Sequence, residues 1–209
     1  MQKTTVPLRE RNRLETWALI HDKASLIASE EGLNKATVEA IADAAGISKR
    51  TFFNYFASKE DAILGIQAPT LSEETIAAFR ADGDQDLFGR TVHLMAAVIR
   101  SMFPAESLSE RRRQLKADYP ELGKRIFAHM RASEELVEAA LLKRHQDGLP
   151  EDTWSELPPG QDSAMALLMM AGTVLRFAFS KDPTVTTNED SPAVYEAIEI
   201  FREAIKATL

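Results

Sequence analysis

The 209-residue sequence contains no cysteine. Disulfides, thiol catalysis and cysteine metal sites are therefore excluded, and the composition fits a reducing compartment. Residues 1–10 have no apolar core of about 7–15 residues, which a secretory signal needs. No run of about 18 uninterrupted apolar residues occurs, and the longest apolar stretch, residues 164–175, is interrupted by Gly172 and Thr173. We expect a cytoplasmic protein in which that stretch is a buried helix.

Motifs typical of enzymes are also absent from the sequence. There is no glycine-rich phosphate loop, nucleophile elbow or paired metal motif. The four histidines show no short metal-ligand spacing: His21, His93, His129 and His145. We therefore expect no enzyme activity, no cofactor and no metal. An enzyme with an appended helical module remains an alternative, and a broad hydrolase and transferase screen would distinguish it.

The charge of the chain is unevenly distributed. The formal net charge is −7, from 25 basic and 32 acidic residues. Residues 1–56 carry eight Lys and Arg against seven acidic residues, so all of the excess negative charge lies in residues 57–209. This asymmetry is compatible with a small DNA-reading module joined to a larger acidic body, although the net charge alone argues against a nucleic-acid partner.

The apolar residues recur at helical spacing throughout, and no segment shows the alternation of a strand. Leu14, Trp17, Ile20, Ala24 and Ile27 predict a first helix over residues 9–30. A fourth helix begins at Ser58, and Pro69 is expected to end or kink it. We predict an all-α chain of about nine helices, with the segments 9–30, 38–44, 48–55, from 58, 72–81, 84–103, 107–118, 120–146, 161–180 and 191–208.

Residues 37–56 have the pattern of a helix-turn-helix. Such a motif needs a small residue where two short helices touch and a glycine in the turn between them. Ala42 and Gly46 meet these requirements, and Thr37 and Ser48 are suited to cap the two helices. The apolar positions that would hold the helices together are Ile41, Ala45, Ile47 and Phe52.

The run TVEAIADAAGISKRTFFNYFASKE, residues 37–60, closely resembles the DNA-binding segment of the tetracycline-repressor (TetR/AcrR) family. Residues 28–33, ASEEGL, resemble the end of the family's first helix, so the resemblance covers about residues 9–64. It implies a helix-turn-helix DNA-binding domain over residues 1–57 and a helical effector-binding and dimerisation domain over residues 58–209. It further implies a ligand-responsive repressor that binds a near-palindromic operator as a dimer and is released by a small-molecule effector.

The resemblance also implies which residues contact double-stranded DNA. The helix capped by Ser48 reads the major groove, and family members contact bases or nearby phosphates at Lys49, Arg50, Thr51, Phe53 and Asn54. They contact the DNA backbone at Thr37, Tyr55 and Lys59. The chemistry agrees: Arg50 suits guanine, Asn54 suits adenine, and Phe53 suits a thymine methyl group. Many members have tyrosine where this chain has Phe53, so this chain lacks the hydroxyl that could form a hydrogen bond at that position.

Each of these residues also has a structural interpretation. Phe52 and Phe56 fit the core better than the DNA surface, and Tyr55 fits either. Three arginines, Arg9, Arg11 and Arg13, suit a flexible minor-groove arm or a solvated surface. A helical module that no longer binds DNA is a third alternative, but it does not explain a full set of cationic and hydroxyl side chains in the motif.

In the family, the C-terminal part binds a ligand and forms the dimer through its last two long helices. Residues 161–180 and 191–208 are the matching segments. The first is apolar nearly all round, so we expect both its own core and a partner to cover it. Two-fold symmetry would then place two recognition helices about 34–36 Å apart on DNA.

The sequence gives a weaker indication of a ligand pocket. Ordinary core packing is the competing interpretation of each candidate, and Arg111, Arg112 and Arg113 fit a solvated helix face. The candidate pocket residues are His93, Met102, Phe103, Phe127, Met130 and Phe177.

Overall fold

The computed structural model describes residues 8–81, 86–104, 109–146, 161–186, 188 and 191–208. These residues form ten α-helices and one 3-10 helix, with no strand, against about nine helices expected. The helix starts expected at residues 84 and 107 lie outside the described residues. The elements are α1 (Leu8–Glu30), α2 (Val38–Ala45), α3 (Lys49–Phe53), α4 (Lys59–Leu64), α5 (Glu73–Ala81), α6 (Leu87–Ser101), α7 (Ser109–Asp118), α8 (Glu121–Gln146), α9 (Gln161–Lys181), η2 (Pro183–Thr186) and α10 (Pro192–Thr208).

Packing divides the chain into two compact units. Unit 1 comprises Met1–Gln67 and Phe103–Ala128, and unit 2 comprises Ala68–Met102 and His129–Leu209. Within the described residues, unit 1 therefore holds α1 to α4 together with α7 and the first turns of α8. The expected division after residue 57 concerns functional domains, and it stays a prediction.

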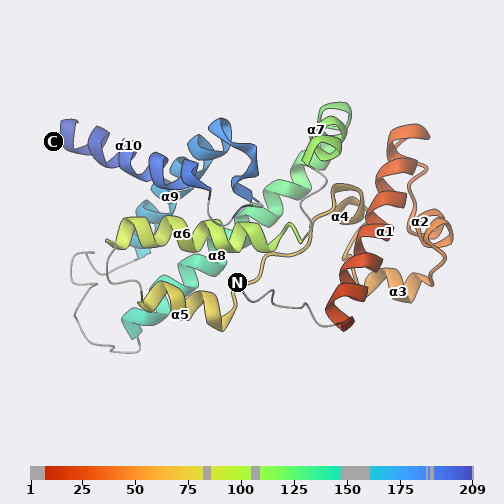
Figure 1. Cartoon of the computed structure of the whole chain (residues 1–209), viewed down its shortest axis with the longest axis horizontal. Helices are drawn as coiled ribbons and strands as arrows, with labels where there is room; N and C mark the ends of the chain where they lie inside the picture. The colour runs from red at the N-terminus through yellow and green to blue at the C-terminus, as the bar shows by residue number, and fades with distance from the viewer. Residues whose placement is uncertain are drawn as a thin grey trace. The chain divides into compact units, whose positions relative to one another are not determined.

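The core of unit 1 is built around three aromatic side chains, Trp17, Phe52 and Phe56. The Trp17 and Phe56 ring centroids are 5.2 Å apart, and those of Phe52 and Phe56 are 6.0 Å apart. All three side chains are at most 2% exposed. Because they come from α1, from α3 and from the residues just after it, they hold the short helices against α1 (Figure 1).

The ends of α2, α3 and α4 follow from local sequence signals. The side-chain oxygens of Thr37, Ser48 and Ser58 accept hydrogen bonds from backbone N–H groups three residues further on, which confirms all three as N-caps. The end of α4 differs from the prediction. It stops at Leu64, with Gly65 in the left-handed conformation (φ 59°), well before Pro69. A glycine C-cap ends this helix because glycine adopts that conformation without a steric penalty.

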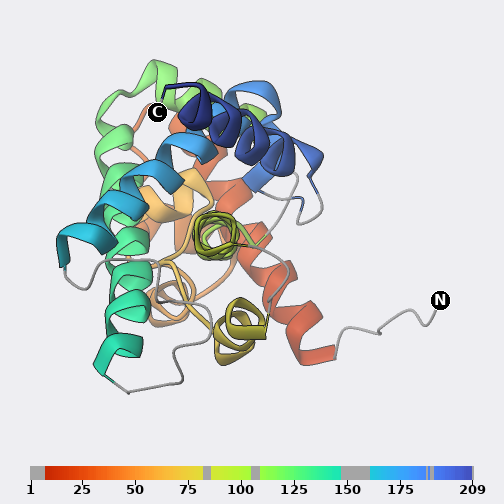
Figure 2. The same ribbon diagram turned by 90° about the vertical axis from the view of Figure 1, so that its left-hand side faces the viewer.

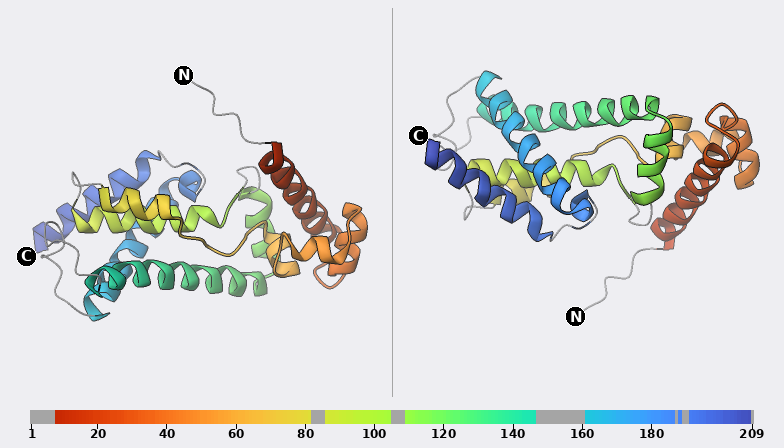
Figure 3. Two further views of the ribbon diagram at one scale, coloured as in Figure 1. Left: turned by 90° about the horizontal axis from the view of Figure 1, so that it is seen from below. Right: turned by 90° about the horizontal axis from the view of Figure 1, so that it is seen from above.

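In unit 2, α6 packs between α5 and the last two α-helices, and Figure 2 shows it end-on. Its amphipathic sequence explains this position, because ten of its fifteen residues are buried. Helices α9 and α10, which precede and follow the 3-10 turn η2 in the chain, lie side by side (Figure 3). Asp86, the N-cap of α6, accepts hydrogen bonds from the Arg202 guanidinium of α10, which fastens the two helices together.

Helix α9 exposes apolar side chains on the side that unit 2 leaves uncovered. Leu167, Leu168, Val174 and Leu175 are buried, whereas Met169 is 68% exposed. In the described part of the chain, α9 is also the one helix long and apolar enough to cross a membrane by length and composition. A core helix of a globular protein meets the same test, so this property is weak evidence for a membrane span.

Gly65 and Gly46 provide a matched pair of substitutions. Both have positive φ, but a Cβ at Gly65 would lie 2.8 Å from the His21 ring, whereas a Cβ at Gly46 would meet nothing within 4 Å. Gly46→Ala should destabilise the protein by about 1–2 kcal/mol through backbone strain alone. Gly65→Ala should cost a further ~1–3 kcal/mol through the clash. Urea unfolding of the two variants measures the difference, and equal losses of stability would contradict this packing.

Candidate nucleic-acid interface

The two helices of the motif meet at a tight turn around Gly46. This residue has φ 67° and ψ 32°, and its N–H donates to the Ala42 and Asp43 carbonyls. The Ile47 N–H also donates to the Ala42 carbonyl, at 2.9 Å. Ala42 itself is 1% exposed. A small residue is needed there because the chain turns back over it before α3 begins.

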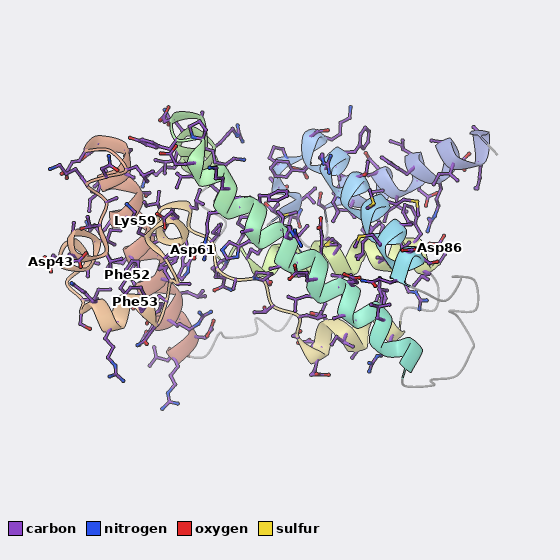
Figure 4. The ribbon with its side chains drawn as sticks, turned by 180° about the vertical axis from the view of Figure 1, so that it is seen from behind. Asp43, Phe52, Phe53, Lys59, Asp61 and Asp86 are labelled. Atoms are coloured by element: carbon purple, nitrogen blue, oxygen red, sulfur yellow. The ribbon has the colours of Figure 1, made fainter. Side chains whose placement is uncertain are left out.

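Helix α3 buries one of its five residues and exposes most of the others. Phe52 is fully buried and makes an edge-to-face contact with Phe53, with ring centroids 5.4 Å apart. Phe53 is 57% exposed, and Lys49 and Arg50 are also exposed. Figure 4 shows the labelled Phe52 and Phe53 on α3, with Asp43 on α2. The surface that α3 presents to solvent therefore combines cationic side chains with an aromatic ring.

Helix α3 is shorter at its C-terminal end than the sequence predicts. Helix α3 stops at Phe53, and Asn54 is its C-cap, with the side chain exposed. Tyr55 is half-buried against the unit 1 core, which agrees with its ambiguous pattern in the sequence. Phe56 is 2% exposed and belongs to the core, as expected.

Two of the hydroxyl groups expected at the interface bond to each other. The oxygens of Ser48 and Thr51 are 2.8 Å apart, and Ser48 also accepts from the Thr51 N–H at 3.0 Å. Thr37 accepts from the Ala40 N–H at 3.1 Å. These contacts fix the first turns of α2 and α3. A role of the three hydroxyls toward DNA stays a prediction.

Both lysines expected at the interface have partners within unit 1. Lys49 Nζ lies 2.5 Å from Glu39 Oε1 on α2, and Lys59 Nζ donates to the Leu33 carbonyl at 3.1 Å. The Lys59 contact ties α4 to the segment that follows α1. Neither partner was predicted from the sequence.

The arginines near the start of the chain lie on α1. Arg13 forms an ion pair with Glu10 at 2.8 Å, and Arg11 lies 3.6 Å from Glu15. Arg9 is also on α1 and exposed. A flexible arm is therefore the wrong interpretation for these three residues, because the helix begins at Leu8.

Helix α4 is held by basic side chains from α7 and α8. Arg125 donates to both carboxylate oxygens of Asp61, at 2.7 and 2.5 Å, and the Asp61 side chain is 1% exposed. Arg112 donates to the Leu64 carbonyl at 2.6 Å and to the Gly65 carbonyl at 3.2 Å. These carbonyls stand at the C-terminal end of α4, where a cation is favoured.

For Arg112, the predicted solvated helix face is wrong. Its side chain is buried, and its guanidinium lies 4.5 Å from the centre of the Phe103 ring. Burial lowers the pKa of Arg112 to about 10. Arg111 and Arg113 are exposed, as the sequence predicts, although Arg111 also pairs with Asp22 at 2.9 Å. An arginine between two exposed arginines gives no local indication of burial.

His21 contacts the same end of α4 from α1. Its Nδ1 lies 2.6 Å from the Ala62 carbonyl, so this nitrogen carries the proton and donates it. Its Nε2 is buried without a hydrogen-bond partner in the described structure. Protonation of Nε2 would bury an uncompensated charge, and desolvation accordingly lowers the pKa of His21 to about 4.

The six candidate pocket residues do not all belong to one unit. Phe103 and Phe127 fall in unit 1, where Phe103 lies beneath Arg112 and Phe127 is 66% exposed. In unit 2, Met102 is fully buried and accepts a weak hydrogen bond from Ser133.

The remaining candidates make aromatic contacts or lie at the edge of the core. The His93 ring is 4.7 Å from that of Tyr195, and Phe177 contacts Phe201 edge-on at 5.8 Å. Met130 is half-buried. Contact of these six residues with a ligand stays a prediction. No group of three or more His, Asp or Glu suited to a metal ion occurs among the described residues.

The capped α2, the glycine turn and the exposed α3 on a shared aromatic core define a helix-turn-helix DNA-binding domain. Residues 20–64 match the family model described as "Bacterial regulatory proteins, tetR family". Over these residues the chain is similar to the helix-turn-helix segment of that family of DNA-binding regulators.

Two solved structures of regulators are similar to the chain. One is the fatty acid degradation regulator FadR from Bacillus halodurans, with 20% identity over 87% of this chain and 94% of that one, at a TM-score of 0.37. The other is the TetR family transcriptional regulator PfmR from Thermus thermophilus, with 19% identity over 85% and 92%, at a TM-score of 0.29. No curated protein matches the sequence.

The buried His21 makes stability depend on pH. Its pKa is about 6.5 in the unfolded chain and about 4 in the folded one, so the unfolded state binds the extra proton between these values. Stability is then complete above pH 6.5 and falls as the pH drops toward 4, by about 3 kcal/mol in total. Urea unfolding at several pH values should show that the free energy of unfolding depends less on pH in His21→Gln than in the wild-type protein. The same dependence in both proteins would contradict this assignment.

Proposed function

We propose that the protein is a ligand-responsive repressor that binds a near-palindromic operator as a homodimer and is released by a small-molecule effector. The observation that carries the DNA-binding part is the exposed face of α3, backed by the buried Phe52. Exposure of an aromatic ring to water is unfavourable, and a ring beside cationic side chains suits a duplex groove.

Within this proposal, three side chains read the operator bases. Arg50 is exposed, and its guanidinium can donate two hydrogen bonds to guanine. Phe53 and Asn54 follow on the exposed surface and suit a thymine methyl group and adenine, respectively. Thr37, at the N-terminus of α2, suits a phosphate.

The exposed apolar residues of α9 and α10 support a dimer. Met165, Met169, Met170 and Phe179 are between 41% and 68% exposed on α9. Ile200 and Ile205 are exposed on α10. A patch of this kind costs free energy in water, and a second copy of the same two helices would cover it with like side chains.

An effector would act through α4, because this helix packs in unit 1 and is followed by the segment that enters unit 2. The contacts of Asp61, Leu64 and Gly65 with α7 and α8 tie α4 to segments later in the chain. The effector must bind one conformation of the protein more tightly than the other to weaken DNA binding. Such a regulator would work in the cytoplasm, where it meets both DNA and small molecules.

DNA binding is tested with a duplex selected by the wild-type protein from fragments of the source genome. Arg50→Ala should weaken binding by about 1–3 kcal/mol and relax the preference at one base position. Arg80→Ala, which removes an exposed arginine of α5 in unit 2, is the control and should leave the affinity unchanged. Gel shifts over a range of salt concentrations measure both variants.

Two results would contradict the proposal. If the wild-type protein selects no duplex even at low salt, DNA binding fails altogether. If Arg50→Ala and Arg80→Ala behave alike, α3 is not the reading element.

The dimer is tested by placing a charge in the exposed patch. Met169→Glu should turn a dimer of the 23.2 kDa chain into a monomer at micromolar concentration, because the interface would bury an unpaired carboxylate. Leu26→Glu is the control, since Leu26 is an exposed apolar residue of α1 in unit 1. Multi-angle light scattering gives the mass, and a monomeric wild type or a dimeric Met169→Glu variant would overturn this interface.

A further inference from the structure

The Lys49 side chain on α3 is paired with a carboxylate of the same DNA-binding unit. Its Nζ lies 2.5 Å from Oε1 of Glu39, ten residues earlier on α2. Both side chains are 58% exposed, so the pair stands on the surface and not in the core. A cation that the family resemblance assigns to DNA contact is therefore accompanied by an acidic group.

Glu39 is held in its charged form at this position. It lies in the first turn of α2, two residues after the N-cap Thr37, where the helix favours a negative charge. The hydrogen bond from Lys49, a hydrogen bond with the backbone of Glu39 itself and the charge of Lys49 lower the pKa of Glu39. The carboxylate is thus ionised at neutral pH, close to the place where phosphates would approach α2 and α3.

We propose that Glu39 competes with DNA phosphates for Lys49 and thereby weakens the binding of the protein to every duplex, whatever its sequence. This inference rests on the DNA-binding function proposed above. It assigns to Glu39 a role that the motif does not indicate: an acidic residue at the interface that limits non-specific affinity and leaves base discrimination to Arg50 and Asn54.

The charges of the pair explain the effect. An exposed ion pair is weak, so a phosphate can take Lys49 from Glu39. The carboxylate then remains beside the DNA without its partner, and the pair as a whole contributes no net positive charge. Because non-specific affinity comes from cations that replace the counterions of the phosphates, Lys49 contributes little while Glu39 is ionised.

The test replaces the carboxylate by the uncharged amide of similar shape, Glu39→Gln. Two probes are used, a duplex selected by the wild-type protein from a random pool and an unselected duplex of equal length. Glu39→Gln should bind both more tightly, and the slope of log K against log salt should steepen by up to about 0.9. A slope steeper by about 0.9 means that, between 1 M and 0.1 M salt, the affinity of the variant rises by roughly eightfold more than that of the wild-type protein.

A double-mutant cycle shows whether the effect acts through Lys49. In the Lys49→Gln background, Glu39→Gln should produce a much smaller gain, because no lysine is left to release. Asp43→Asn removes another exposed carboxylate one turn further along α2 and is the matched control for general charge repulsion. It should change the affinity less than Glu39→Gln. Thermal melting checks that the variants stay folded.

Several outcomes would overturn the inference while the DNA-binding function stands. These are an unchanged affinity and salt slope for Glu39→Gln, an equal gain in the Lys49→Gln background, or an equal gain from Asp43→Asn. Weaker binding of Glu39→Gln to the selected duplex alone would show instead that Glu39 positions Lys49 for base reading. A wild-type protein that binds neither duplex would overturn the proposed function and this inference together.

Discussion

The position of α3 depends on the burial of Phe52. A helix of five residues is too short to be stable by itself, so its place must come from packing. Phe52 contacts Phe56, which in turn contacts Trp17 of α1, and this aromatic group is closed to solvent. With Phe52 fixed inward, Arg50 and Phe53 must point away from the core. The same contact that stabilises the unit therefore exposes the surface that we propose for DNA.

The second constraint is the way α4 is fastened. Its buried Asp61 carboxylate is bonded to Arg125 of α8. The carbonyls of Ala62, Leu64 and Gly65 at the C-terminal end of α4 are bonded to side chains of α1 and α7. Removing one partner of such a contact leaves a buried polar group uncompensated, so the helix cannot shift without cost. Through these contacts α7 and the start of α8 belong to the same unit as the helix-turn-helix. An effector signal that reaches α4 would have to change this set of contacts.

The sequence predicts most of what depends on neighbouring residues. The N-caps at Thr37 and Ser48 and the turn at Gly46 are confirmed, because each follows from a few adjacent positions. Contacts between distant residues were missed: Arg112 reaches carbonyls 47 and 48 positions away, and nothing beside it in the sequence indicates burial. At the candidate site the exposed and buried faces of α3 were predictable from spacing. The pairing of Lys49 with Glu39 was not, since a charge pattern does not show which cation has a partner.

The central claim is that α3 and the N-terminus of α2 form the surface that meets DNA. Amide NMR of the labelled protein, titrated with a selected duplex, tests it most directly. The account predicts that the largest shifts occur over residues 37–39 and 48–54, with the buried amides of α1 changing little. Shifts that leave residues 48–54 unchanged while the duplex is bound would contradict it.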